Sequence, residues 1–246
     1  MKNPIVTLLI NLFAIMIAYY ASLLLHEWGH GFVAWLYGVK TSPFDIQYGG
    51  YLLQNADENV DYVALMASGR SVASALIAIA GPVVSLIILI IALSKLRSNK
   101  INNKPIKFTF IYWLLIMNMI PSIQYLSVSP FVSGGDTGHF AGGLHFSPWW
   151  IFIPGTLFII FLLRMILKNI IPKAYIVIPI KNVFAQNLFL LTSLCLMFLF
   201  IYTHGYNPLT DKGLDLFTKV MVVISICLVP ILFIIYNPLR IKLLKS

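Results

Sequence analysis

The sequence predicts an all-α, polytopic membrane protein with about six transmembrane helices and a small membrane-associated β-hairpin after the first span. Of its 246 residues, 59% are hydrophobic and only 10% are charged, whereas roughly a quarter of the residues in a soluble domain are charged. The hydrophobic residues also form six blocks of about 20 residues, which is the helix length that crosses the hydrocarbon core of a bilayer.

The predicted spans follow one another with short connections. They cover residues 5–37, 71–93, 108–128, 149–167, 184–202 and 217–236. Most connections are basic, as in "SKLRSNKINNKPIK", and such residues anchor membrane helices beside anionic lipid. The net charge of +9 therefore indicates contact with the lipid bilayer and no nucleic-acid partner. Cys195 and Cys227 lie inside predicted spans, where we expect small buried side chains rather than a disulfide or metal ligands.

The connection at residues 38–62 differs from the others because it is acidic. It contains "FDIQYGGYLL", in which Phe44, Ile46 and Tyr48 alternate with polar residues before a Gly-Gly pair. Alternation followed by such a turn predicts the β-hairpin, at residues 44–53.

The first span is interrupted by the stretch "LLLHEWGHGF", which places His26, Glu27 and His30 inside an apolar run. Positions i and i+4 of a helix lie one turn apart on the same face, so both imidazoles can reach one ion. Glu27 lies beside that face. Two histidines that bind Zn²⁺ and a glutamate that acts as general base are typical of His-Glu-x-x-His metalloproteases. The alternative is a polar patch for a partner helix, or histidines buried through hydrogen bonds.

A catalytic zinc ion usually has a third protein ligand, and few acidic residues remain to supply it. Asp136 lies in the glycine-rich connection 129–148, and a bilayer tolerates such irregular backbone only beside protein or a water-filled cavity. Glu58 is the alternative, but its setting "NADENVD" is typical of a solvated loop, so we favour Asp136. His139 could replace Asp136 as the third ligand, or it could contact a ligand without binding the metal itself. Two histidines are expected to be loop or interfacial residues: His145 and His204.

These motifs resemble the site-2 protease family of intramembrane zinc metalloproteases. The ordered elements are His26-Glu27-x-x-His30, Gly81-Pro82 in "AIAGPVVSL", Asn118-x-x-Pro121 in "MNMIPS", and Asp136-x-Gly138. The resemblance covers roughly residues 5–140, although Thr137 replaces the usual glycine and the stretch before Asp136 is longer than in the family. It implies a three-span catalytic core at residues 1–140 and three accessory transmembrane helices at 141–246. In physical terms, Gly81 allows a neighbouring helix to approach closely.

The resemblance further implies a zinc metalloendopeptidase with one Zn²⁺ per chain on His26, His30 and Asp136. Glu27 would take a proton from the attacking water and pass it to the leaving amine. The implied substrate is a membrane-spanning protein, such as a regulator released by intramembrane cleavage, in a bacterial or archaeal cell membrane.

Two further regions are expected to meet the substrate. Asn118 lies where the third span breaks, and its neutral amide could hold the substrate carbonyl or the oxyanion beside the zinc. A helical substrate must unwind before its carbonyls are accessible, and the hairpin residues Phe44, Ile46 and Tyr48 could capture the freed segment by strand addition. A hairpin that only covers the membrane surface is the alternative.

Two other classes of protein stay open. Intramembrane histidine and aspartate residues also mark ion pathways, so a transporter or ion-binding protein is one alternative. A protease-like scaffold without activity is the other, although the intact Glu27 speaks against it.

The orientation in the membrane has two opposing indications. Family members that begin with the His-Glu-x-x-His span usually run it from outside to inside. The positive-inside rule instead places both termini of this chain in the cytoplasm. We favour the second orientation, in which the site opens toward the extracytoplasmic face.

Overall fold

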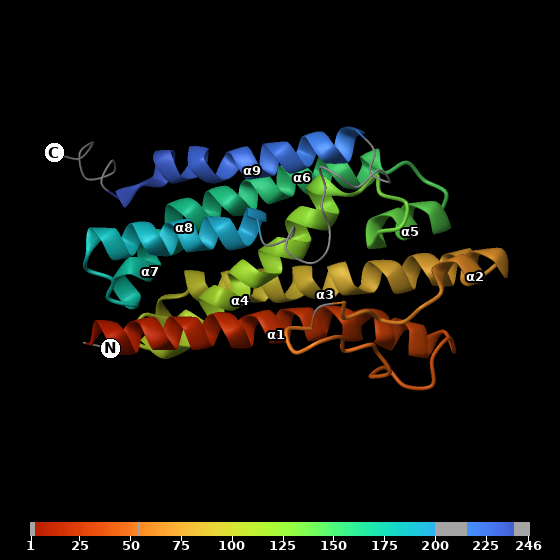
Figure 1. Ribbon diagram of the computed structural model, residues 1–246, viewed down its shortest axis with the longest axis horizontal. Helices are drawn as coiled ribbons and strands as arrows, with labels where there is room; N and C mark the ends of the chain where they lie inside the picture. The colour runs from red at the N-terminus through yellow and green to blue at the C-terminus, as the bar shows by residue number, and fades with distance from the viewer. Residues whose placement is uncertain (1–2, 54, 200–215, 239–246) are drawn as a thin grey trace.

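The computed structural model describes residues 3–53, 55–199 and 216–238, and its regular elements are helices (Figure 1). They are α1 (Pro4–Leu36), α2 (Tyr62–Ala67), α3 (Ser71–Arg97), α4 (Pro105–Ile123), α5 (Asp136–Gly143), α6 (Trp149–Met165), α7 (Ile171–Val177), α8 (Val183–Leu199) and α9 (Leu216–Tyr236). Shorter turns are the 3₁₀ turn η1 (Asn99–Ile101) and the π-helical turns η2 (Gln124–Val128) and η3 (Ile166–Ile170). The predicted helical class is confirmed.

Five helical segments in the described part of the chain are long and apolar enough to cross a membrane: Pro4–Leu36, Ser71–Arg97, Pro105–Val128, Trp149–Val177 and Leu216–Tyr236. The sixth predicted span corresponds to α8, which has 17 residues and runs along the bundle beside α4 and α9 (Figure 1). Cys195 is a half-buried free thiol on α8 and Cys227 is an exposed one on α9, so neither is the fully buried side chain that the sequence predicts.

Helix α1 begins where its sequence provides a cap. The Asn3 side chain accepts a hydrogen bond from the Ile5 amide at 2.9 Å, and Pro4 occupies the first turn, where its missing N–H is not needed. The helix has 33 residues, about 50 Å at about 1.5 Å per residue. It is therefore longer than the hydrocarbon core of about 30 Å, and His26 lies about two-thirds of the way along it.

Helix α4 is the centre of the bundle. α1 and α3 pack antiparallel, and α4 passes obliquely between this pair and the layer formed by α6, α8 and α9 (Figure 1). In the most apolar stretch of the span formed by α4 and η2, 61% of the residues are buried inside the protein, compared with 22% in the corresponding stretch of α1. Three large aromatic side chains of α4 are fully buried: Phe108, Tyr112 and Trp113. This core holds the α1–α3 pair, and the polar residues on it, in a fixed position.

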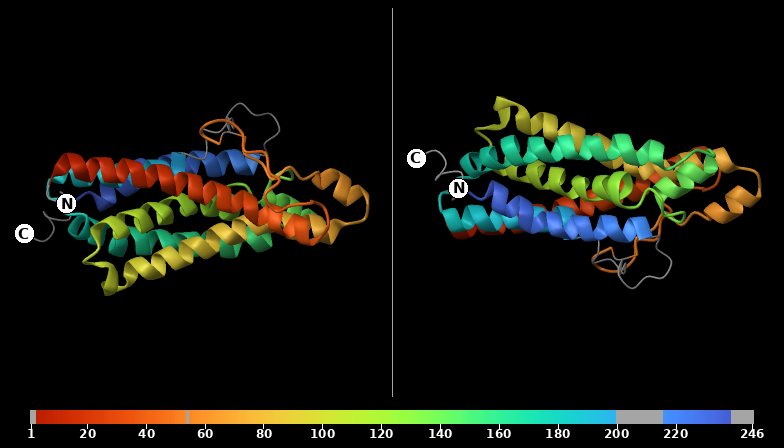
Figure 2. Two further views of the ribbon diagram at one scale, coloured as in Figure 1. Left: turned by 90° about the horizontal axis from the view of Figure 1, so that it is seen from below. Right: turned by 90° about the horizontal axis from the view of Figure 1, so that it is seen from above.

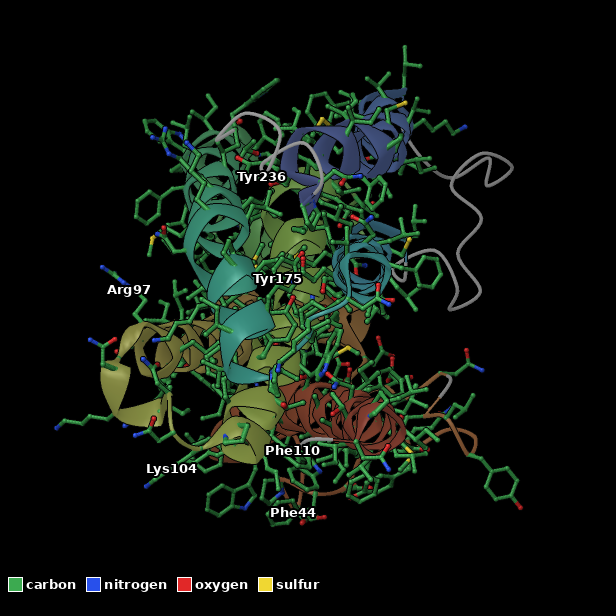
Figure 3. The ribbon with its side chains drawn as sticks, turned by 90° about the vertical axis from the view of Figure 1, so that its left-hand side faces the viewer. Phe44, Arg97, Lys104, Phe110, Tyr175 and Tyr236 are labelled. Carbon is green, nitrogen blue, oxygen red and sulfur yellow. The ribbon has the colours of Figure 1, made fainter. Side chains whose placement is uncertain are left out.

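The two ends of the bundle differ in charge. The start of α1, the α3–α4 turn, α7 and the start of α8 share one end, onto which Figure 3 looks, with Arg97 and Lys104 labelled. The basic residues at this end are Lys95, Arg97, Lys100, Lys104, Lys107, Arg164, Lys168, Lys173 and Lys181. Lys173 joins two of these segments by donating to the Leu96 and Ser98 carbonyls at 2.8 and 3.0 Å. We call this the basic end; α2 and α5 lie at the opposite end (Figure 1).

The predicted β-hairpin is wrong. Within the described ranges, the β pairing of this segment is one isolated antiparallel bridge, between Gln47 and Asp57. Leu53, Asn55 and Asn59 have positive φ angles of 54°, 60° and 55°, which a regular strand does not contain. Figure 2 shows the segment as an irregular loop between α1 and α2.

Contacts with α1, and not pairing in a sheet, determine where Phe44 and Ile46 of this loop lie. Phe44 packs edge-on against Trp28 of α1, with ring centroids 5.3 Å apart. Ile46 is buried, and its side chain lies against Gly31 of the same helix. Tyr48 is exposed. The loop therefore covers the turn of α1 that carries the His-Glu-x-x-His motif, and its described residues form no regular strand.

Candidate metal centre

Two side chains of α1 and one from a distant part of the sequence meet between α1, α3 and α5. His26 and His30 project from one face of α1, as their spacing predicts, and their Nε2 atoms lie 3.2 Å apart. Oδ2 of Asp136, the first residue of α5, lies 3.2 Å from His26 Nε2 and 3.3 Å from His30 Nε2. The two histidines are only 5% and 1% exposed. The cluster is therefore a buried donor set that faces a single point.

Helix α3 sets the orientation of both imidazole rings. Nδ1 of His30 lies 2.7 Å from the carbonyl oxygen of Ile77. Because a carbonyl oxygen only accepts, this Nδ1 carries the hydrogen in a neutral ring and Nε2 keeps its lone pair. Nδ1 of His26 lies 3.0 Å from Ser85 Oγ. Hydrogen bonds of this kind hold the orientation of metal-binding histidines, and the carbonyl partner of His30 also fixes its tautomer.

Helix α3 can approach the histidines because residue 81 is glycine. A Cβ atom at this position would lie 2.2 Å from His30 Nε2 and 2.8 Å from His26 Cδ2. Any larger residue would therefore displace both rings. The close helix approach that the sequence predicts for Gly81 is confirmed.

The three donor atoms have the spacing of a tetrahedral zinc site. Zinc–nitrogen and zinc–oxygen bonds are about 2.0–2.1 Å long, so two ligands of a tetrahedral ion lie about 3.3 Å apart. The observed separations of 3.2, 3.2 and 3.3 Å agree with this value. Two imidazoles and one carboxylate are also a donor set of catalytic zinc, which leaves a fourth position open. The residues present therefore fit the metal.

Glu27 lines a cavity beside these donors. The cavity has a volume of about 290 Å³ and lies between α1, the end of α4 and the loop after α1; Glu27, His26, Leu53 and Tyr125 are among its lining residues. A water molecule occupies about 30 Å³ in the liquid, so water can reach both Glu27 and the face of His26.

Comparison with known proteins agrees with the motif order and with this geometry. A family model described as Peptidase family M50 matches residues 13–231. The chain belongs to peptidase family M50. This is the site-2 protease family of membrane metalloproteases, for which zinc is typical. The match continues past residue 140, so the likeness extends beyond the three spans that carry the sequence motifs. No curated protein and no solved structure matches the chain.

Glu58 of this M50 family member is not the solvated residue that its sequence setting suggests. It is only 7% exposed, and its carboxylate accepts a hydrogen bond from the Tyr62 hydroxyl. The donor atoms of Glu27, His30 and Glu58 lie within 4.8 Å of one another. The expectation of a solvated loop is wrong because the loop folds back onto α1 and brings Glu58 beside Glu27 and His30. Within the loop, Lys40 donates to the Glu58 carbonyl. Glu58 thus lies beside the site, but outside the group formed by the two histidines and Asp136.

The other two histidines that the structure describes, His139 and His145, are not part of the group of three donor atoms. His139 stacks on Tyr62, with ring centroids 4.4 Å apart and planes at 16°, and burial lowers its pKa, which favours the neutral ring. It therefore contacts a residue that hydrogen-bonds Glu58. His145 is exposed in the turn after α5, as predicted. His204 lies outside the described residues.

Asn118 joins α4 to α1 near the motif. It is fully buried, and its Nδ2 donates to Ser22 Oγ and to the Leu114 carbonyl, both at 2.8 Å. The two amide hydrogens are thus engaged within the protein. A role for Asn118 in holding the substrate oxyanion would require one of these bonds to break, whereas Ser22 itself lines the cavity.

Several residues that hold the site have no recognisable sequence motif. Ser85 is the one with a usable signal, because it is a polar residue in an apolar span one helical turn after Gly81. The Ile77 carbonyl and Tyr125 have none. A backbone carbonyl is present at every residue, and an aromatic residue near a span end is common.

Proposed function

We propose that this M50 family member is an intramembrane zinc endopeptidase that hydrolyses peptide bonds of membrane-spanning proteins. The observation that carries the proposal is the convergence of His26, His30 and Asp136 at tetrahedral spacing beside Glu27. Family membership supports a membrane metallopeptidase. The donor set supports zinc as the metal.

The residues of the site have separate tasks in this reaction. His26, His30 and Asp136 would hold one Zn²⁺, which when bound polarises a peptide carbonyl and makes water more acidic. The Glu27 carboxylate accepts a proton from the attacking water and returns it to the nitrogen of the leaving amine. The Ile77 carbonyl keeps Nε2 of His30 available as a ligand, and Ser85 holds the orientation of the His26 ring.

The position of the site supports an unwound membrane segment as the substrate. His26 lies deep in an apolar helix of 33 residues, so the bond to be cut must reach that depth. In an intact α-helix each interior carbonyl accepts a hydrogen bond from the amide four residues further on. The segment around the cut must therefore unwind before its carbonyl can react beside Glu27, which lines the cavity.

Removal and return of the metal test the proposed function. We expect a purified preparation to cleave a model transmembrane substrate, to lose cleavage after treatment with a zinc chelator, and to regain it with about one equivalent of Zn²⁺. Cleavage that persists in metal-free protein would contradict the proposal. So would a metal-loaded protein that only moves ions across a liposome membrane, or one that never cleaves.

The choice of third ligand gives a second prediction. Asp136→Ala should reduce zinc binding by about 100-fold or more, because it removes the carboxylate shared by both histidines. Glu58→Ala should retain about one zinc per chain. Zinc content and affinity are measured in both variants. If Glu58→Ala loses the metal while Asp136→Ala keeps it, Glu58 is the ligand instead.

The charge difference between the ends of the bundle predicts the orientation. The positive-inside rule places the basic end in the cytoplasm, so the candidate metal centre would open toward the extracytoplasmic face. Single cysteines replace Asn102, at the basic end, and His145, at the opposite end, in a variant without Cys195 and Cys227. We expect a membrane-impermeant thiol reagent added to intact cells to label position 145 only. Labelling of position 102 only would establish the inverse orientation.

A further inference from the structure

Tyr125 contacts two of the three proposed metal ligands. Its ring stacks on the imidazole of His26, with centroids 5.5 Å apart and planes at 12°. Its hydroxyl is close enough to the Asp136 carboxylate to interact with it. One side chain thus connects a ligand from α1 with a ligand from α5, which are 110 residues apart in the chain.

The local structure of η2 holds Tyr125 at this position. α4 ends at Ile123 and continues directly as the π-helical turn Gln124–Val128, which the Ser129 amide closes by donating to the Gln124 carbonyl at 2.8 Å. A π-turn inserts a residue relative to the α-helical repeat and so changes the direction of the side chains in it, often at functional sites.

Helix α6 supports this turn from the other side. Gly155 of α6 lies so close that a Cβ atom there would be 2.8 Å from the Cβ of Leu126. Thr156 donates to Ser127 Oγ at 3.2 Å. The residues directly after Tyr125 are therefore packed against a second helix, which limits movement of the turn.

The two contacts of Tyr125 oppose two different motions of the ligands. An imidazole can rotate about its Cβ–Cγ bond, and a ring stacked in parallel on it resists that rotation. A carboxylate can turn so that the wrong oxygen faces the metal, and an interaction with a neighbouring hydroxyl group resists that turn. Ser85 restrains His26 from α3, so Tyr125 provides a second restraint on His26 from α4.

We propose that Tyr125 is a positioning residue that holds His26 and Asp136 in the geometry that binds Zn²⁺. The inference rests on the proposed zinc site. It divides into a contribution of the ring, which acts on His26, and a contribution of the hydroxyl, which acts on Asp136. The two contributions can be separated by substitution.

The experiment compares three variants with the wild-type protein. Tyr125→Phe keeps the stacked ring and removes the hydroxyl; Tyr125→Leu removes both. Tyr112→Phe is the matched control, because it removes a buried hydroxyl of the same helix, which hydrogen-bonds Ser193 at 2.7 Å far from the centre. Zinc affinity is measured by chelator competition. The visible absorption spectrum of Co²⁺-loaded protein reports the geometry of the ligands.

We expect Tyr125→Phe to bind zinc about 10-fold more weakly and Tyr125→Leu about 100-fold more weakly, because loss of a residue that contacts a metal ligand typically lowers metal affinity by such factors. The Co²⁺ spectrum should change in both variants. Tyr112→Phe should match the wild type in affinity and spectrum. If Tyr125→Phe and Tyr125→Leu both match the wild type, the inference is wrong even if cleavage falls. A wild-type protein that binds no zinc would instead refute the proposed function, so the two failures are distinguishable.

Discussion

We expect the Glu27→Gln variant to lose cleavage of a model transmembrane substrate by about 100-fold to 10,000-fold, the usual contribution of a general base, while it keeps about one zinc per chain. Glutamine has the size of glutamate but cannot accept a proton. Because Glu27 is not one of the three proposed zinc ligands, whose donor atoms lie 3.2–3.3 Å apart, the metal should remain bound. The measurements are zinc content and the rate of cleavage.

Glu58→Gln is the matched control for this variant. Glu58 is the other glutamate of the chain, and it is equally buried within 4.8 Å of Glu27 and His30, but it does not line the cavity. The control should keep most of its activity. The assignment of the base to Glu27 would fail if Glu58→Gln were inactive and Glu27→Gln were active.

We expect the Gly81→Ala variant to lose zinc binding and, with it, cleavage. The added methyl group would lie 2.2 Å from His30 Nε2, far inside van der Waals contact, so the imidazole must leave its position. The same substitution in a helix interior would otherwise stabilise the helix by about 1 kcal/mol. Loss of the metal therefore could not come from a weaker helix α3.

Gly142→Ala controls for the effect of an added methyl group. Gly142 is in helix α5, close to Asp136, and a Cβ atom there meets nothing within 4 Å. This variant should bind zinc like the wild type, as measured by metal analysis after size-exclusion chromatography. A Gly81→Ala protein with full zinc content would show that α3 can move away from the histidines, and the tight approach would then be unnecessary for binding.

The helical class and the positions of the histidines could be predicted from the sequence because both depend on local patterns. A run of about 20 apolar residues forms a membrane helix wherever it occurs, since the bilayer leaves its backbone no other hydrogen-bond partners. The spacing of His26 and His30 places them on one face of any helix. The sharp charge difference between the two ends of the bundle likewise follows from which connections carry lysine and arginine.

The tertiary structure decided what surrounds these histidines. The chain between His30 and Asp136 passes through three further helices, and only their packing brings the carboxylate to within 3.2 and 3.3 Å of the imidazoles. The same packing buries Glu58, although the local sequence predicts a solvated residue. It also holds Phe44 and Ile46 against α1, although their alternation with polar residues predicts a hairpin. In each case a contact with α1 outweighs the local preference. Such contacts depend on the distance between helices, which at this site is set by the missing side chain of Gly81, and a pattern along one segment carries no information about that distance.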